Sequence, residues 1–149
     1  MKETQRTITP FEVRQVGIIV RDMEKTMQQF RSILGIEHFK LLPSPEAIIN
    51  GKKIDCEAKL AFAQSGPIEI ELIEPVKGES IWMEFLRSKG EGVHHFGIFV
   101  PDIDNELDRY AKMGIGILQS GGDEYVKYAY MDTTGITGTI IELLQVKKT

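Results

Sequence analysis

Two stretches of the sequence decide the fold: QVGIIVRDMEKTMQQF at residues 15–30 and HFGIFVPDIDNELDRY at residues 95–110. They align without a gap at an offset of 80 residues, and Gly17 matches Gly97. Each stretch has the pattern of a short β-branched strand, then an Asp suited to cap a helix, then an amphipathic helix. The sequence therefore indicates two copies of one unit.

Each copy also ends on strands of similar sequence. Further strand-like segments are expected at about 56–63 and 67–74 in the first copy and at about 125–131 and 138–146 in the second. We therefore predict an α+β fold in which paired βαβββ modules form a cupped mixed β-sheet with helices on the outside. The predicted single domain covers residues 11–147, as module one (about 11–75), a bridging helix (about 80–88) and module two (about 92–147).

The bulk properties exclude several classes of protein. Of the 149 residues, 42% are hydrophobic and 27% charged, which is typical of a globular domain. The formal net charge of -4 and pI near 5.4 predict no binding to nucleic acid or to an anionic membrane. Cys56 is the single cysteine, and the first residues lack the pattern of a signal peptide, so we expect a cytoplasmic protein.

Four polar side chains occupy strand positions that suit apolar residues. Glu71 and Glu142 fall at corresponding places in the closing strands IEIELIEP and GTIIELLQV, where an unpaired carboxylate would be costly. Side chains alternate along a strand, so only one of the adjacent His94 and His95 can point into a cup. The repeat selects His95, which matches Gln15. A solvated strand face or a hydrogen-bonded core imidazole could explain each residue singly, whereas a shared cation explains all four.

The chemistry of these four side chains predicts one divalent metal ion. One imidazole nitrogen, one amide oxygen and two carboxylates suit Zn, Co, Ni or Mn. A non-haem iron oxygenase would ordinarily need a second histidine on the metal. The other histidines are His38, in an irregular stretch, and His94, on the wrong face of its strand, so oxygen chemistry is disfavoured.

Paired βαβββ units with polar residues on their first and last strands resemble the vicinal oxygen chelate superfamily, which includes glyoxalases, bleomycin resistance proteins and dioxygenases. The run ELIEPVKGESIWMEFLRSKGEGVHHFGIFVPDID at residues 71–104 is similar to methylmalonyl-CoA epimerase, which carries a similar ELLEP strand and GEGLHH motif. The resemblance implies metal binding by Glu71, His95 and Glu142, in agreement with the choice made from the residues.

The sequence departs from the epimerase pattern at two places. The first ligand of that family is usually His, and Gln15 stands there; a Gln, Glu, His, Glu set is instead similar to the zinc site of eukaryotic lactoylglutathione lyase. Some epimerases carry a second acidic residue on the strand before Glu71, where this chain has Lys59, with Glu57 two residues earlier. This substitution argues against epimerisation by two bases.

The resemblance implies a metal-dependent isomerase that removes a proton next to a carbonyl, with Glu142 as the first candidate base and Glu71 as the second. The substrate class would be a thioester or a thiol adduct. Two alternatives stay open: a lactoylglutathione lyase, and a ligand-sequestering protein of the bleomycin-resistance type. By analogy with the family, and because sheet edges need cover, a homodimer is expected.

Overall fold

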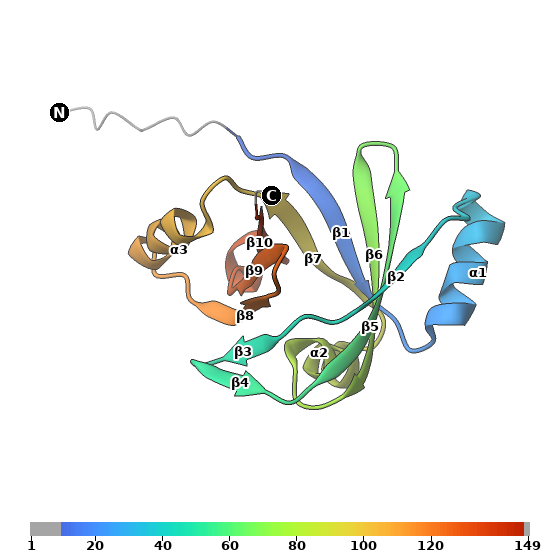
Figure 1. The fold of residues 1–149 in the computed structure, drawn as a ribbon, viewed down its shortest axis with the longest axis horizontal. Helices are drawn as coiled ribbons and strands as arrows, with labels where there is room; N and C mark the ends of the chain where they lie inside the picture. Colours follow the sequence, from blue (N-terminus) through green and yellow to red (C-terminus); the bar gives the residue numbers. More distant parts are fainter. Residues whose placement is uncertain (1–9, 148–149) are drawn as a thin grey trace.

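A curled, ten-stranded mixed β-sheet forms the body of the chain, described for residues 10–147 in a computed structural model (Figure 1). The strand order is β2-β5-β6-β1-β7-β10-β9-β8-β3-β4. The strands are β1 (Val13–Ile19), β2 (Lys40–Pro43), β3 (Ala47–Ile49), β4 (Lys52–Ile54), β5 (Glu57–Ser65), β6 (Ile68–Lys77), β7 (Gly92–Phe99), β8 (Ile117–Gly122), β9 (Val126–Met131) and β10 (Ile140–Val146). The helices are α1 (Met23–Leu34), α2 (Ile81–Lys89), α3 (Ile103–Lys112) and α4 (Thr134–Thr137). The predicted α+β fold with a cupped mixed sheet is confirmed.

The two repeated units meet at the centre of the sheet. Strand β1 pairs in parallel with β6, its counterpart β7 pairs in parallel with β10, and β1 and β7 pair antiparallel with each other. Figure 1 shows these four strands side by side along the curl. The closing strands of the two copies therefore flank the central pair, which brings the four predicted ligands onto neighbouring strands.

The Asp that follows each first strand starts the helix as expected. The side chain of Asp22 accepts a hydrogen bond from Lys25 N at the start of α1, and Asp102 does the same for Asn105 N at the start of α3. Gly35 adopts a left-handed conformation that ends α1. No helix within residues 10–147 is long and apolar enough to cross a membrane.

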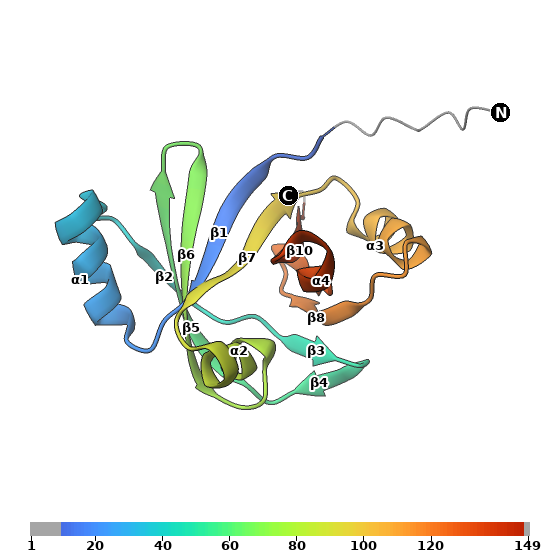
Figure 2. The same ribbon diagram turned by 180° about the vertical axis from the view of Figure 1, so that it is seen from behind.

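Helices α1 and α3 cover the outer faces of the two halves of the sheet (Figures 1 and 2). Met23 of α1 is buried with Leu72 of β6, and Ile103 of α3 is buried with Leu143 of β10. Since strand side chains alternate, the neighbours of these sheet residues face the inside of the curl. That inner face carries a second core that includes Trp82 from α2.

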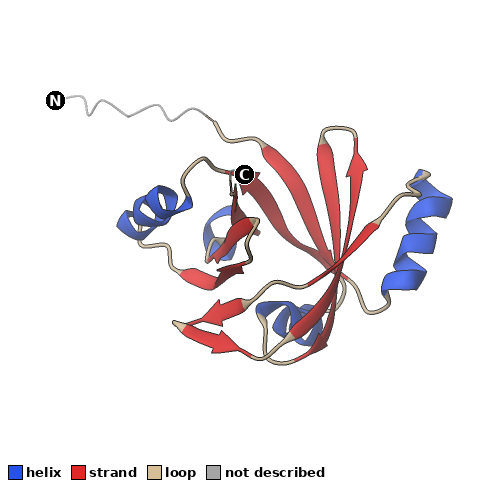
Figure 3. Cartoon of the chain, viewed as in Figure 1, coloured by secondary structure: helices blue, strands red, loops and turns tan. Residues whose placement is uncertain are grey.

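One hairpin was missed by the sequence analysis. Strands β3 and β4 follow β2 within the first unit, yet β3 pairs with β8 of the second unit at Ile48 and Ser120 (Figure 3). The hairpin thus passes from the first unit to the second and closes one side of the curled sheet. Tyr128 in β9 donates its hydroxyl proton to the carbonyl oxygen of Glu46 at 2.8 Å, which holds the start of the hairpin against the inner wall.

Candidate metal centre

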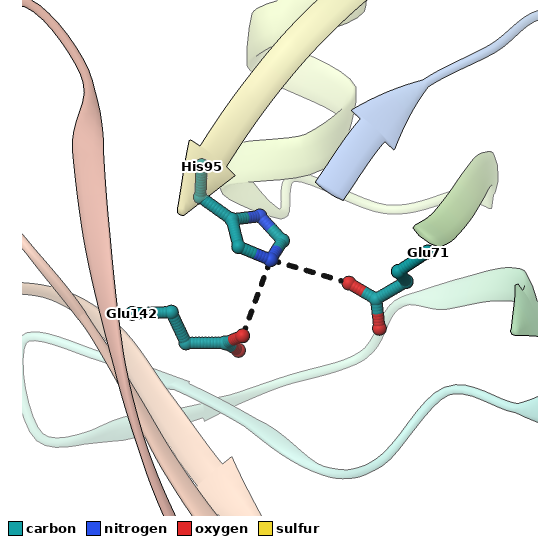
Figure 4. Close-up of side chains that lie close together, drawn as sticks. All are labelled: Glu71, His95 and Glu142. Carbon is teal, nitrogen blue, oxygen red and sulfur yellow. Dashed lines mark ion pairs between the residues drawn. The ribbon is translucent and has the colours of Figure 1, made fainter. Parts of the chain in front are cut away.

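The four predicted side chains converge inside the curled sheet. Gln15 lies on β1, Glu71 on β6, His95 on β7 and Glu142 on β10, and their exposed fractions are 3%, 6%, 0% and 4%. The Nε2 atom of His95 is 3.2 Å from Gln15 Oε1, 3.3 Å from Glu71 Oε1 and 3.2 Å from Glu142 Oε1. Figure 4 shows the imidazole between the two carboxylates. All four side chains therefore present a donor atom to one point.

Strand register explains how residues from four strands reach that point. Gly17 on β1 lies opposite Glu71 on one side and His95 on the other. Gly97 on β7 lies opposite Gln15 on one side and Glu142 on the other. Two of the four side chains therefore flank each glycine, and the two glycines are the ones that match in the repeat.

Both glycines are required by close approach. A Cβ atom built on Gly17 would collide with the His95 ring at Cε1, Nδ1 and Nε2. A Cβ atom on Gly97 would lie 2.9 Å from both Cβ and Oε1 of Gln15. The absence of side chains on the central strands therefore creates the space in which the donor atoms meet.

Glu69 fixes the orientation of the Gln15 amide. Gln15 Nε2 donates a hydrogen bond of 2.8 Å to Glu69 Oε1. An ionised carboxylate accepts hydrogen bonds and cannot donate them, so the amide nitrogen faces Glu69 and the amide oxygen faces His95. Gln15 thereby offers an oxygen, the atom that can bind a cation.

The unsatisfied polar atoms of the cluster fit a bound cation. Oε1 of Glu71 and Oε1 of Glu142 are buried and, apart from their contacts with His95 Nε2, have no hydrogen-bond partner within residues 10–147. Donor atoms of Glu71, His95 and Glu142 all lie within 4.8 Å of one another. One imidazole N–H cannot satisfy three oxygens, and buried carboxylates without compensation destabilise a fold. A divalent ion would compensate the charge of both carboxylates and bind the amide oxygen, so the donor set suits Zn, Co, Ni or Mn, as expected from the sequence.

The cluster has perturbed acidities in the metal-free state. Burial lowers the pKa of His95, but the negative charge and hydrogen bonds of Glu142 and Glu71 raise it more, to about 9. Burial raises the pKa of Glu71 to about 6, although the hydrogen bond and charge of His95 oppose this shift. At neutral pH the His95 ring of the metal-free protein is therefore protonated on both nitrogens.

A cavity of about 320 Å³ opens onto the cluster. Its walls are largely apolar, with Leu60 and Phe62 from the first half and Tyr128 and Tyr130 from the second, and Lys40 also lines it. Concave apolar sites with a few convergent polar groups are the usual form of small-molecule sites. The cluster can therefore act on a small molecule that enters the cup.

Two residues considered from the sequence lie outside this cavity. Lys59 is 64% exposed and forms an ion pair of 3.7 Å with Glu74, and Glu57 is also exposed on the same strand. Leu60 and Phe62 line the cup from the opposite face of the same strand, so Glu57 and Lys59 face outward. The structure therefore brings neither residue to the cluster.

One polar neighbour was missed by the sequence analysis. Glu69 lines the cavity and contacts Gln15, and it lies two residues before Glu71 on the same strand face. This spacing was a signal for its position, since alternate residues of a strand share a face. Nothing in the sequence connects Glu69 with the amide of Gln15.

The chain belongs to the glyoxalase/bleomycin resistance protein/dioxygenase superfamily, whose sequence model matches residues 14–130. Among characterised relatives it is similar to the mitochondrial methylmalonyl-CoA epimerase of Mus musculus. The identity is 29% over 89 residues, which cover 59% of this chain and 45% of that protein. The uncharacterised protein YqjC of Bacillus subtilis (strain 168) is 24% identical over 135 residues, covering 89% of this chain and 90% of that protein.

Solved structures share the fold over nearly the whole chain. A hypothetical protein from Bacillus halodurans C-125 superposes with a TM-score of 0.70 at 23% identity, covering 95% of this chain and 98% of that chain. Methylmalonyl-CoA epimerase from Mycobacterium tuberculosis superposes with a TM-score of 0.66 at 19% identity, covering 96% of this chain and 95% of that chain.

Proposed function

We propose that the chain is a metal-dependent isomerase that removes and returns a proton next to the carbonyl of a thioester, in the manner of a methylmalonyl-CoA epimerase. The observation that carries this proposal is the meeting of Gln15, Glu71, His95 and Glu142 beside a largely apolar cavity, which Gln15, Glu71 and Glu142 line. The similarity to the mouse epimerase supports the choice of substrate class. A methylmalonyl-CoA epimerase structurally similar to this chain has been solved with methylmalonyl-CoA.

The four residues would hold the ion through His95 Nε2, the Gln15 amide oxygen and one oxygen of each glutamate. A divalent cation bound there supplies positive charge that polarises a carbonyl oxygen and stabilises the negative charge that develops when the adjacent proton leaves. The apolar part of the cavity wall, with Leu60, Phe62 and Tyr130, would lower the local polarity when a substrate fills the cavity, which would strengthen the electrostatic effect.

Glu142 is our first choice for the base. Its carboxylate is buried at the floor of the cavity, beside Ile140 and Leu144 on the same strand face. A base must lie within hydrogen-bonding reach of the proton that it removes, and a carbonyl held at the cluster places its neighbouring carbon beside these side chains. Glu71 is the second candidate, because burial raises its pKa to about 6, and a base with a pKa near the working pH is efficient.

The test compares Glu142→Gln with Glu71→Gln in an assay of deuterium exchange into methylmalonyl-CoA. Both variants keep an oxygen donor and remove a proton acceptor. We expect Glu142→Gln to lower exchange by about 10²–10⁴-fold while metal content is retained, and Glu71→Gln to lower it less. Loss of exchange in Glu71→Gln with near-normal exchange in Glu142→Gln would reassign the base to Glu71.

A lactoylglutathione lyase is the second candidate function. It is favoured by the amide ligand Gln15, since a Gln, Glu, His, Glu set is similar to the zinc site of the eukaryotic lyase. The same residues would move a proton between the two carbons of a hemithioacetal. Turnover of the methylglyoxal-glutathione adduct without exchange into any acyl-CoA would establish this function. Tight binding of either compound with no proton exchange would instead indicate a ligand-sequestering protein.

A further inference from the structure

The side chain of His94 lies beside the candidate metal centre, in contact with His95 and with Tyr130 of the inner core. The expectation that strand alternation turns His94 away from His95 is therefore wrong, because the pairing of β1 with β7 shifts register at His94. His94 is buried, with an exposed fraction of 2%, and its Nδ1 atom is 3.0 Å from Nδ1 of His95. The ring makes edge contacts with Phe85 of α2 and Tyr130 of β9, at centroid distances of 5.1 and 5.3 Å. His94 is therefore fixed in place by packing, with one nitrogen aimed at the ligand histidine.

This contact can carry only one proton, and the metal centre determines which ring holds it. His95 Nε2 faces the three oxygens, so a cation would bind His95 through the Nε2 lone pair. A neutral imidazole with a free Nε2 lone pair carries its proton on Nδ1. In that state His95 Nδ1–H donates to His94 Nδ1, which is the acceptor.

The second nitrogen of His94 shows that the arrangement is costly. Its Nε2 atom is buried and has no hydrogen-bond partner within the described chain. Accepting through Nδ1 leaves the proton of neutral His94 on Nε2, where it is unpaired, and a buried donor without a partner destabilises the fold. An apolar residue of similar shape would avoid this cost, so the fold alone does not account for a histidine at this position.

We propose that His94 is a positioning residue that sets the tautomer and orientation of His95 for cation binding. The inference rests on the proposed metal site. Ligand histidines generally donate their second N–H to an acceptor that fixes the ring, and removing that acceptor typically weakens metal affinity about 10–100-fold. Such acceptors are commonly carboxylates, backbone carbonyls or water, and here the neighbouring imidazole takes that role.

The test measures the affinity of the metal-free protein for Zn²⁺ by competition with a chelator, for wild type and three variants. His94→Phe keeps an aromatic ring against Phe85 and Tyr130 but removes the acceptor. His94→Asn keeps a side-chain oxygen near the position of Nδ1. Phe85→Leu is the matched control, since Phe85 contacts the His94 ring without a hydrogen bond. The melting temperature of each metal-free variant reports packing separately from metal affinity.

We expect His94→Phe to weaken Zn²⁺ binding about 10–100-fold, and we expect His94→Asn and Phe85→Leu to stay within about threefold of wild type. In the Zn²⁺-loaded wild type, ¹⁵N NMR should show His95 protonated at Nδ1, and His94→Phe should expose that proton to faster exchange. Unchanged affinity in His94→Phe would overturn the proposal. Equal losses in His94→Phe and either His94→Asn or Phe85→Leu would also overturn it, in favour of packing. A wild type that binds no Zn²⁺ would instead overturn the metal site itself.

Discussion

Cation binding at the cluster should release a proton from His95. Burial lowers the pKa of His95, but the carboxylates of Glu142 and Glu71 beside its ring outweigh this effect and raise the pKa from 6.5 to about 9 in the metal-free protein. A ligand nitrogen must lose its proton before it binds a metal, so proton and cation compete. At pH 7.5 this competition weakens binding by about 30-fold relative to the deprotonated site, since each pH unit below the pKa costs about a factor of ten.

The direction and the slope of this pH dependence follow from two groups. Affinity should rise about tenfold per pH unit between pH 6 and pH 9, where His95 alone loses a proton on binding. Below pH 6 the affinity should change by up to about a hundredfold per pH unit. The reason is that burial raises the pKa of Glu71 to about 6, so that below this pH its carboxyl also holds a proton that the metal must displace. The raised pKa of His95 also stabilises the metal-free fold below pH 6.5, and this contribution is lost as pH rises through about 9.

Isothermal titration calorimetry with Zn²⁺ tests this reasoning between pH 6.5 and 8.5. Repeating each titration in buffers of different ionisation enthalpy gives the number of protons released per ion. We expect about one proton at pH 7 to 8. Affinity that does not change with pH, together with no proton release, would refute the assignment of His95 as a ligand that is protonated before the metal binds.

Three further predictions concern the same site. Chelation of a metal-loaded sample should lower the melting temperature by about 5–10 °C, because a ligand at 100 times its Kd stabilises the native state by about 2.7 kcal/mol; an unchanged melting curve after proven metal removal would argue against a buried site. Gly17→Ala should weaken Zn²⁺ binding by at least about 100-fold in a competition assay, since the new Cβ displaces the His95 ring, and near-normal binding would show that the ring relaxes freely. Glu69→Leu should weaken binding about tenfold because the Gln15 amide can then rotate, whereas Glu69→Asp, which retains a carboxylate that can only accept, should cost less; equal effects would assign Glu69 another role.

The repeat made most of the fold predictable. Strand patterns, the capping residues Asp22 and Asp102, and the matched closing strands were local signals, and the structure uses each of them as expected. The β3–β4 hairpin was not predictable, because β3 finds its partner β8 across the molecule. Short strands of this kind are defined by pairing rather than by an apolar pattern.

The sequence also placed the candidate ligands, because polar residues in apolar strands stand out. What it could not supply was the set of contacts around them. The tautomer relation between His94 and His95 and the amide orientation set by Glu69 depend on distances between side chains that sequence patterns do not encode. The predictions of a homodimer and of a cytoplasmic location stay predictions, which size-exclusion chromatography and cell fractionation can test.

A crystal structure of Zn²⁺-loaded protein with anomalous scattering data would show whether Gln15, Glu71, His95 and Glu142 bind one cation. We expect a single strong anomalous peak between these side chains, with a donor atom of each residue within about 2.0–2.6 Å of the ion. A protein that stays metal-free at saturating Zn²⁺, or an ion held elsewhere while these side chains keep their metal-free contacts, would contradict this expectation.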